Sequence, residues 1–142
     1  RWSQLKFTPT AGAIVDQNNE YVSGSILSNV IISGGGQSSS STVPTITGVN
    51  GESYTFPYFV NVTITDAAAD GIYFRGYFIN ARNVFKGVSV RKAAYGLYIE
   101  DSGYSTIVIQ GFESKSTQFN ESQIRILKTT PDMVLISIVS II

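Results

Sequence analysis

The stretch from Asn61 to Lys115 decides the fold of this chain. It reads NVTITDAAADGIYFRGYFINARNVFKGVSVRKAAYGLYIEDSGYSTIVIQGFESK. Its second half repeats its first half, because Val88 follows Val62 after 26 residues and Gly96 follows Gly71 after 25. Self-similarity at a fixed period of this size is typical of stacked repeats, in which each unit buries its apolar side against the next.

Apolar and polar residues alternate in both halves of the repeat. In 62–64 and 88–90 a hydroxyl stands between two apolar residues, and in 72–74 and 97–99 a tyrosine does so. Alternation with a period of two predicts short strands, and the Gly, Asn, Asp and Ser residues between them predict corners. A weaker third copy follows at 123–126. The pattern predicts an all-β parallel solenoid with coils of about 25 residues.

The remainder of the chain is predicted to extend this solenoid. Residues 1–22 are expected to form an N-terminal cap or lead-in strands, at 5–8 and 13–15, and residues 23–142 the coils. Val30 matches Val62 in pattern, but the step is longer because of a Gly/Ser-rich segment. Residues 34–54 are therefore predicted to be a long loop inserted into the solenoid wall.

Composition excludes several classes of function. The 142 residues carry equal numbers of acidic and basic side chains, so no diffuse field attracts nucleic acid. The chain contains neither histidine nor cysteine, which excludes imidazole or thiol catalysis and metal sites with imidazole or thiolate ligands from its own residues. No apolar run is long enough for a membrane-spanning helix, and no cofactor is expected. A chain that opens at Arg1 is expected to be a piece of a longer protein.

Alternation also predicts which side chains point outwards. If Ile72 and Phe74 face the interior, Tyr73 and Arg75 point into solvent. By the same rule, Tyr98 and Glu100 point into solvent one coil later. Coils in a solenoid lie about 4.8 Å apart. One outer wall is then expected to carry a ladder of Tyr73, Tyr98 and Arg125, with Arg75 beside Glu100.

A second wall is expected to align Thr65, Arg91 and Lys115, with Asp66 beside Lys92. The tyrosine ladder has two interpretations, a stacking platform for sugar rings or simple stabilisation of the sheet by cross-strand aromatic pairs. The charged neighbours are either ligand-binding groups or surface ion pairs. We therefore consider Tyr73, Tyr98, Arg75, Arg91, Lys92 and Arg125 as candidate ligand-binding residues.

The two repeat units, at 61–72 and 87–99, resemble coils of the pectin-lyase-like right-handed parallel β-helix superfamily, which includes pectate lyases, polygalacturonases and phage tailspikes. The resemblance covers roughly residues 22–142. It implies a right-handed β-helix with a binding groove on one outer wall, and long acidic or neutral polysaccharides as ligands. Its tailspike members imply side-by-side homotrimers that are secreted or displayed on virions.

The polygalacturonase motifs are not preserved, because their histidine is absent and Arg125-Ile126-Leu127-Lys128 breaks the last of them by one residue. Tailspike-type catalysis uses carboxylate pairs, so the candidate catalytic acids are Glu100 with Glu113 and Asp66 with Asp70. Alternatively, these acids are solvated corner residues. A weaker alternative has Asp66 and Asp70 holding a Ca²⁺ ion for lyase chemistry, with Arg91 or Lys92 as the base.

Two functions follow as expectations. The first is a segment that binds or processes polysaccharides, in a tailspike or a secreted protein at the virion surface or outside the cell. The second is a structural module of a fibre, adhesin or filament that associates with copies of itself and has no substrate. A tyrosine-lined groove with acids in reach would favour the first function, and outer walls that bury against other copies would favour the second.

Overall fold

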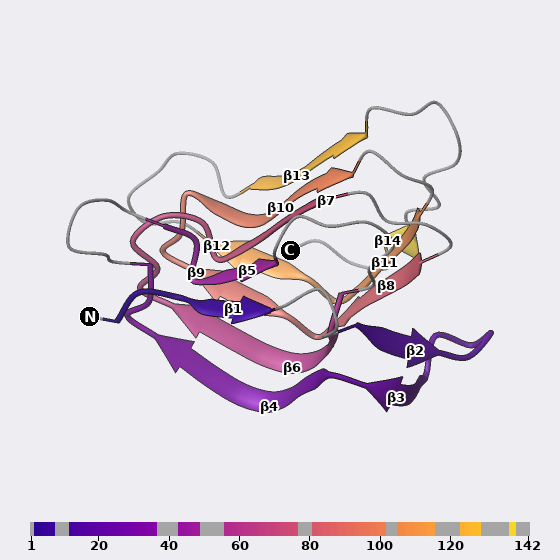
Figure 1. Ribbon diagram of the computed structural model, residues 1–142. Helices are drawn as coiled ribbons and strands as arrows, with labels where there is room; N and C mark the ends of the chain where they lie inside the picture. Colours follow the sequence, from indigo (N-terminus) through magenta and orange to yellow (C-terminus); the bar gives the residue numbers. More distant parts are fainter. Residues whose placement is uncertain are drawn as a thin grey trace.

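The computed structural model describes residues 2–7, 12–36, 43–48, 56–76, 81–101, 105–115, 123–128 and 137–138. These residues form an all-β structure in which nearly all strand pairs are parallel (Figure 1). The described residues contain no helix, and hence none that could cross a membrane.

Two parallel sheets make up most of the described structure. The first sheet has the order β1 (Leu5–Phe7), β5 (Ile46–Gly48), β7 (Ile72–Gly76), β10 (Tyr95–Asp101) and β13 (Gln123–Lys128). The second sheet has the order β12 (Glu113–Lys115), β9 (Ser89–Arg91), β6 (Tyr58–Thr65), β8 (Ala81–Lys86), β11 (Ser105–Gln110) and β14 (Ser137–Ile138), with β4 (Ile26–Ser33) paired to β6. From β4 onward the chain alternates between the sheets, and after β7 each return to the second sheet begins with two consecutive strands, β8 with β9 and β11 with β12, before the chain crosses back to the first.

The registers confirm the repeat that the sequence predicts. Ile72 pairs with Leu97, and Leu97 pairs with Ile124 in the next strand. In the second sheet Val30 pairs with Val62, whose neighbour Thr63 pairs with Ser89. Residues at equivalent positions of successive repeats thus lie side by side, as a parallel stack requires.

Left-handed corner residues let each repeat bend at the same place. Asn29, Asn61, Gly87 and Gly111 have φ between 52° and 67° and follow one another across the second sheet. The Asn61 side chain donates a hydrogen bond from Nδ2 to Asn29 Oδ1 at 3.1 Å. Asparagine and glycine tolerate this region best. The two glycines stand where β8 gives way to β9 and β11 to β12, and the two asparagines lie inside the longer strands β4 and β6.

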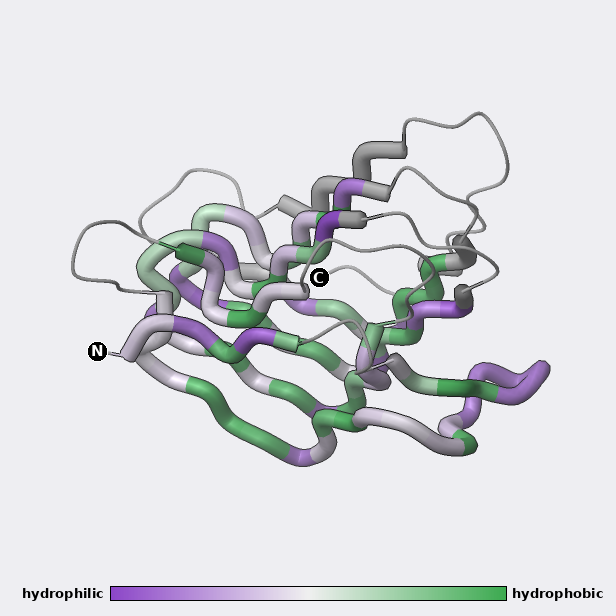
Figure 2. Tube along the Cα trace, in the orientation of Figure 1, coloured by the Kyte–Doolittle hydropathy of each residue, from purple (hydrophilic) through white to green (hydrophobic). Residues whose placement is uncertain are grey.

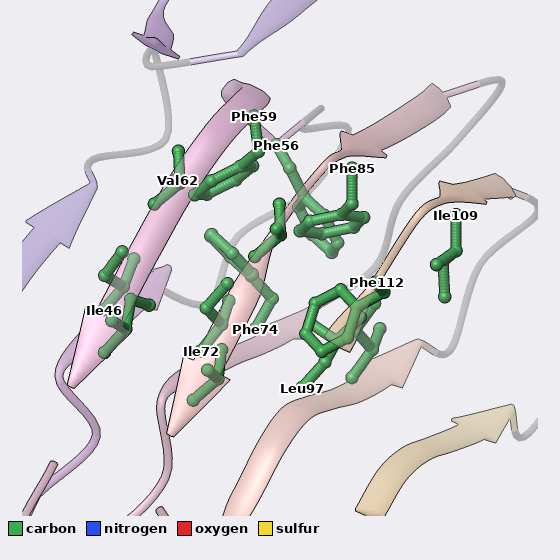
Figure 3. Close-up of a cluster of buried hydrophobic side chains, with 14 of the residues drawn as sticks. Ile46, Phe56, Phe59, Val62, Ile72, Phe74, Phe85, Leu97, Ile109 and Phe112 are labelled. Atoms are coloured by element: carbon green, nitrogen blue, oxygen red, sulfur yellow. The ribbon is translucent and has the colours of Figure 1, made fainter. Parts of the chain in front are cut away.

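The core lies between the two sheets and is almost entirely apolar. Phe59 and Phe85 stack with ring centroids 5.0 Å apart, and Phe56 stacks on Phe74 at 4.0 Å (Figure 3). Gly48 stands next to Phe74, and a Cβ on Gly48 would collide with that ring. Each repeat therefore contributes its inward residues to one continuous column, the arrangement that the alternation predicts.

A strand occupies part of the segment predicted to be an inserted loop. Within 34–54, the described residues 43–48 contain β5, which pairs with β1 on one side and β7 on the other. Ile46 on this strand is completely buried. The Gly/Ser run lengthens the connection before β5, so the period of the repeat is not visible in the sequence here. The strand that follows still contributes an inward-facing isoleucine.

The N-terminal region also differs from a simple cap. The predicted strands at 5–8 and 13–15 correspond to β1 and β2 (Ala13–Val15), but β2 pairs antiparallel with β3 (Tyr21–Gly24). This hairpin packs on the outside of the second sheet, where Ala13 joins a small cluster with Tyr58, Val84 and Val108 (Figure 1). An apolar stripe on the outer face of that sheet is thereby covered.

We expect the left-handed conformation of Asn61 to affect the free energy of unfolding of variants at this position. Replacing Asn61 with Ala removes its hydrogen bond and places a Cβ-bearing residue without a compensating side chain at a φ of 52°. Replacing it with Gly removes the same amide but relieves the strain, so Asn61→Gly should be more stable than Asn61→Ala by about 1 kcal/mol. Urea unfolding followed by circular dichroism compares the two variants, and equal midpoints would contradict a left-handed corner at this position.

Candidate functional site

The outer face of the first sheet gathers the polar and aromatic residues of the candidate site. Tyr73 and Arg75 project from β7, and Tyr98 and Glu100 project from β10. The registers pair Tyr73 with Tyr98 and Arg75 with Glu100, as the alternation predicts. The tyrosine ladder and the neighbouring ion pair therefore exist as one cluster, which we call the tyrosine wall.

Glu100 is the centre of this cluster. Its Oε1 accepts a hydrogen bond from the Tyr98 hydroxyl at 2.6 Å, and its Oε2 accepts one from the Tyr73 hydroxyl at 3.3 Å. Arg75 Nε lies 3.1 Å from the same Oε2. Three donors thus converge on one carboxylate, so the two tyrosines and the arginine are fixed relative to one another.

The rings of the tyrosine wall are tilted against one another. Tyr73 and Tyr98 have centroids 5.1 Å apart and an interplanar angle of 61°. Tyr95 adds a third ring, 5.5 Å from Tyr98 and tilted by 51°. The three rings are half-buried, which leaves part of each in contact with solvent. The surface is a faceted aromatic patch and not a flat platform.

Tyr95 belongs to the site although alternation alone assigns it to the interior. Tyr95 and Leu97 have the same parity, but the register shifts between them, so that Gly96 forms a bulge in β10. A bulge inserts one residue and reverses the facing of what precedes it. The signal in the sequence is the glycine inside the strand pattern, which marks a bulge or a close approach of the backbone.

Burial and the Glu100 charge act on the Tyr73 phenol. Burial raises the pKa of Tyr73 above its ordinary value, the charge and hydrogen bond of Glu100 raise it further, and Arg75 opposes them. The folded state therefore favours the neutral phenol. The Tyr73 phenol therefore stabilises the folded protein at pH values below its pKa in the unfolded chain, which is about 10. This contribution is lost as the pH rises through the higher pKa of Tyr73 in the folded protein.

Asp70 lies at the other end of β7, just before the strand begins. Its Oδ1 accepts a hydrogen bond from the Tyr95 backbone N–H at 3.2 Å. Burial raises the pKa of this carboxyl, and the hydrogen bond from Tyr95 lowers it in part. Asp70 thus holds the start of β10 beside β7, and its contact with the backbone gives it a structural task.

The remaining candidate acids have partners of their own. Glu113 lies on β12 in the second sheet, where its Oε2 accepts from the Ser89 hydroxyl at 3.3 Å and lies 3.8 Å from Arg91 Nη2. Its backbone partner is Ser89, and Glu100 pairs with Arg75 in the first sheet. The proposed pair of Glu100 and Glu113 is therefore divided between two sheets, each acid with its own cation.

Asp66 and Lys92 lie side by side, as the sequence predicts. Lys92 Nζ lies 2.8 Å from Asp66 Oδ1, and both residues have a φ of 56° at the same corner of successive repeats. The described residues contain no group of three or more acidic residues that could hold a metal ion. Asp66 is thus engaged by a lysine, and Asp70 by the Tyr95 backbone.

The basic candidates fall on different walls. Arg91 pairs in register with Thr65 and with Lys115 in the second sheet, as predicted, and together with Lys92 it lies away from the tyrosine wall. Arg125 stands opposite Tyr98 in the backbone register of the first sheet, and its side chain lies outside the described part of the structure. Arg75 is the candidate cation whose described side chain belongs to the tyrosine wall.

Comparison of the chain with family models, with curated proteins and with solved structures gives no significant match. The arrangement of the residues themselves therefore carries the functional argument.

We expect Glu100→Gln to lower the pKa of Tyr73, because both the negative charge and the anionic hydrogen-bond acceptor are removed. Burial, the largest single cause of the raised pKa, remains in this variant, and Arg75 continues to oppose it. NMR titration of ring-labelled tyrosine measures the pKa, with Tyr73→Phe to assign the signal. Glu113→Gln, on the other sheet, is the control and should leave the titration unchanged. An unaltered Tyr73 titration in Glu100→Gln would contradict the contact.

Proposed function

We propose that this chain is a saccharide-binding segment of a right-handed parallel β-helix, of the kind carried by tailspikes and secreted polysaccharide-processing proteins. The observation that supports binding is the tyrosine wall, three half-buried tyrosine rings fixed around Glu100 and Arg75. Aromatic faces match the apolar C–H faces of sugars, and the charged groups beside them can bond the hydroxyls. Such a ligand would be met outside the cell or at a virion surface.

The handedness of the proposed β-helix has a physical basis. Parallel strands joined by a crossover within one sheet are right-handed in nearly all proteins, because the right-handed twist of the strands favours that path. The parallel registers of successive strands in both sheets supply the crossovers to which the rule applies.

Binding is a better proposal than glycoside cleavage. Cleavage by two carboxylates requires a separation of about 5 Å in retaining enzymes or 6.5–9.5 Å in inverting ones. Glu100 and Glu113 belong to different sheets and each is paired with an arginine. Glu100 is also held by two tyrosine hydroxyls, which suits a positioning group.

Tyr98 is the residue on which the test of binding depends, since its ring contacts both other rings. A glycan array should identify bound saccharides, and Tyr98→Ala should weaken their binding by about tenfold, as measured by isothermal titration calorimetry. Tyr98→Phe should retain most of the affinity, because the ring remains and only the hydroxyl bonded to Glu100 is lost.

Tyr21→Ala is the matched control for this experiment. Tyr21 is a partly exposed tyrosine in the hairpin on the second sheet, with its ring 5.8 Å from Tyr58. Its removal should leave saccharide binding unchanged. A chain that binds no glycan on the array, or a Tyr98→Ala variant with the affinity of the wild type, would refute the proposal.

A second candidate function, a self-associating structural module, is favoured by the distribution of exposed apolar side chains. Large exposed hydrophobic residues of the described structure all lie between Trp2 and Ile31, and Ile31 is 77% exposed. Figure 2 shows the hydrophobic character of β4, the strand that carries Ile26 and Ile31 at the edge of the second sheet. Exposed apolar residues on an edge strand are typical of contact surfaces.

Light scattering tests this alternative. If β4 mediates association, the wild-type chain should have a concentration-dependent mass above 15.4 kDa, and Ile31→Asn should shift it towards that value. Thr63→Asn, at the paired position of β6, is the control and should leave the association unchanged. A wild-type chain that stays at the monomer mass at all concentrations would rule out self-association through this strand.

A further inference from the structure

We propose that Tyr73 and Tyr98 form a site of oxidative modification, at which a one-electron oxidant joins the two rings in a dityrosine cross-link. The oxidant class is a haem peroxidase acting with hydrogen peroxide. The bond would tie β7 to β10 of the next repeat, in a chain that has no cysteine and hence no disulfide for this purpose. The proposal goes beyond saccharide binding and does not depend on it.

The two rings lie close to the separation of bonded rings. Tyr73 and Tyr98 are paired in the parallel register of β7 and β10, and their ring centroids are 5.1 Å apart. Directly bonded rings lie closer than this by less than the length of one carbon–carbon bond. The interplanar angle of 61° is no obstacle, because bonded rings can twist about the bond that joins them. Rotation about χ2, a broad torsion in tyrosine, can bring the rings together without moving the backbone.

One carboxylate accepts a hydrogen bond from both phenols. Glu100 Oε1 lies 2.6 Å from the Tyr98 hydroxyl, and Oε2 lies 3.3 Å from the Tyr73 hydroxyl. A phenol that loses an electron becomes a strong acid, so a base in hydrogen-bond contact can take its proton as the electron leaves. The side chain of Glu100 is 29% exposed, which lets it pass the first proton to water before it accepts the second.

The coupling balances without any further group from the chain. Each phenol gives up one electron and its hydroxyl proton, and the two radicals form a carbon–carbon bond between the ring carbons next to the hydroxyl groups. The hydrogen on each of these carbons then moves through water to the ring oxygen and restores the phenol. The pair has lost two electrons and two protons, which hydrogen peroxide takes up to become two molecules of water.

A second tyrosine pair donates to carbonyl oxygens instead. Tyr21 and Tyr58 have ring centroids 5.8 Å apart and an interplanar angle of 57°, similar to the pair on the wall. The Tyr21 hydroxyl donates to the Gly24 carbonyl, and the Tyr58 hydroxyl donates to the Asn19 carbonyl. A neutral carbonyl is a much weaker acceptor of a proton than a carboxylate, so this pair should couple more slowly. The chain therefore contains its own comparison at a similar ring separation.

Treatment of the whole chain with a haem peroxidase and hydrogen peroxide tests the site, with dityrosine fluorescence to follow the reaction. Gel filtration isolates the monomer, so that only bonds within one molecule are counted. Its mass should fall by two hydrogen atoms, and mass spectrometry of the digested chain should place the first cross-link between Tyr73 and Tyr98. Tyr73→Phe and Tyr98→Phe should each abolish this cross-link. Tyr21→Phe and Tyr95→Phe are the matched controls and should leave it unchanged.

Glu100→Gln separates the role of the base from the proximity of the rings. The amide can still accept a hydrogen bond but cannot take up the proton, so the cross-link should form at least about tenfold more slowly. Glu113→Gln, on the second sheet, should leave the rate unchanged. Circular dichroism checks that both variants fold. Should Glu100→Gln fail to fold, the pair of Tyr21 and Tyr58 in the wild type carries the comparison, and it should couple more slowly than the pair on the wall.

The cross-linked monomer should unfold several degrees above the untreated chain, because the bond restricts the unfolded state. An unchanged midpoint would refute the role of the bond as a tie between repeats. The modification site itself would be overturned by a monomer without dityrosine, by a first cross-link between other tyrosines, or by an unchanged rate in Glu100→Gln. Tyr95 is the competing partner that the mapping must exclude, since its ring lies 5.5 Å from Tyr98 on the same strand.

Discussion

The parallel backbone ladder between successive repeats is the constraint on which the rest of the structure depends. Each strand bonds to the equivalent strand of the next repeat, so inward residues form apolar columns and outward residues form ladders. The ladder can persist only if every repeat turns at the same place. The left-handed corner residues, of which Asn61 and Gly87 are two, provide that common turn at little cost.

The tyrosine wall is a consequence of the same ladder. Tyr73 and Tyr98 meet because their strands are in register. Glu100 accepts from one hydroxyl with each of its oxygens, and Arg75 in the neighbouring strand contacts the oxygen that Tyr73 also uses. The cluster therefore needs no loop to position it. A site that rests on strands of a packed sheet is rigid, which lowers the conformational entropy lost when a ligand binds.

The hairpin shows how the fold treats apolar residues on an outer face. Tyr58, Val84 and Val108 would form an exposed stripe on the second sheet, and the hairpin buries it with Ala13. Polar contacts secure the cover, since Lys86 Nζ lies 2.6 Å from the Glu20 carboxylate. Ile31, further along β4, remains exposed, and this contrast makes β4 the natural place to look for contacts between molecules.

The sequence alone determined the repeat, the parallel strands, the outward ladder of Tyr73 with Tyr98 and the pairing of Arg75 with Glu100. These features follow from the local alternation of apolar and polar residues and from a fixed period, both of which are visible in the order of residues along the chain. Only the tertiary structure decided that β5 interrupts the predicted loop, that Tyr95 joins the wall and that Glu113 lies on a different sheet from Glu100. The glycine-rich insertion before β5 lengthens one repeat, so that its period is not visible in the sequence. The bulge at Gly96 reverses the direction in which Tyr95 faces. A bend in the backbone between β10 and β12 places Glu113 on the second sheet. Each of these depends on where the backbone goes in space and not on the spacing of residues along it.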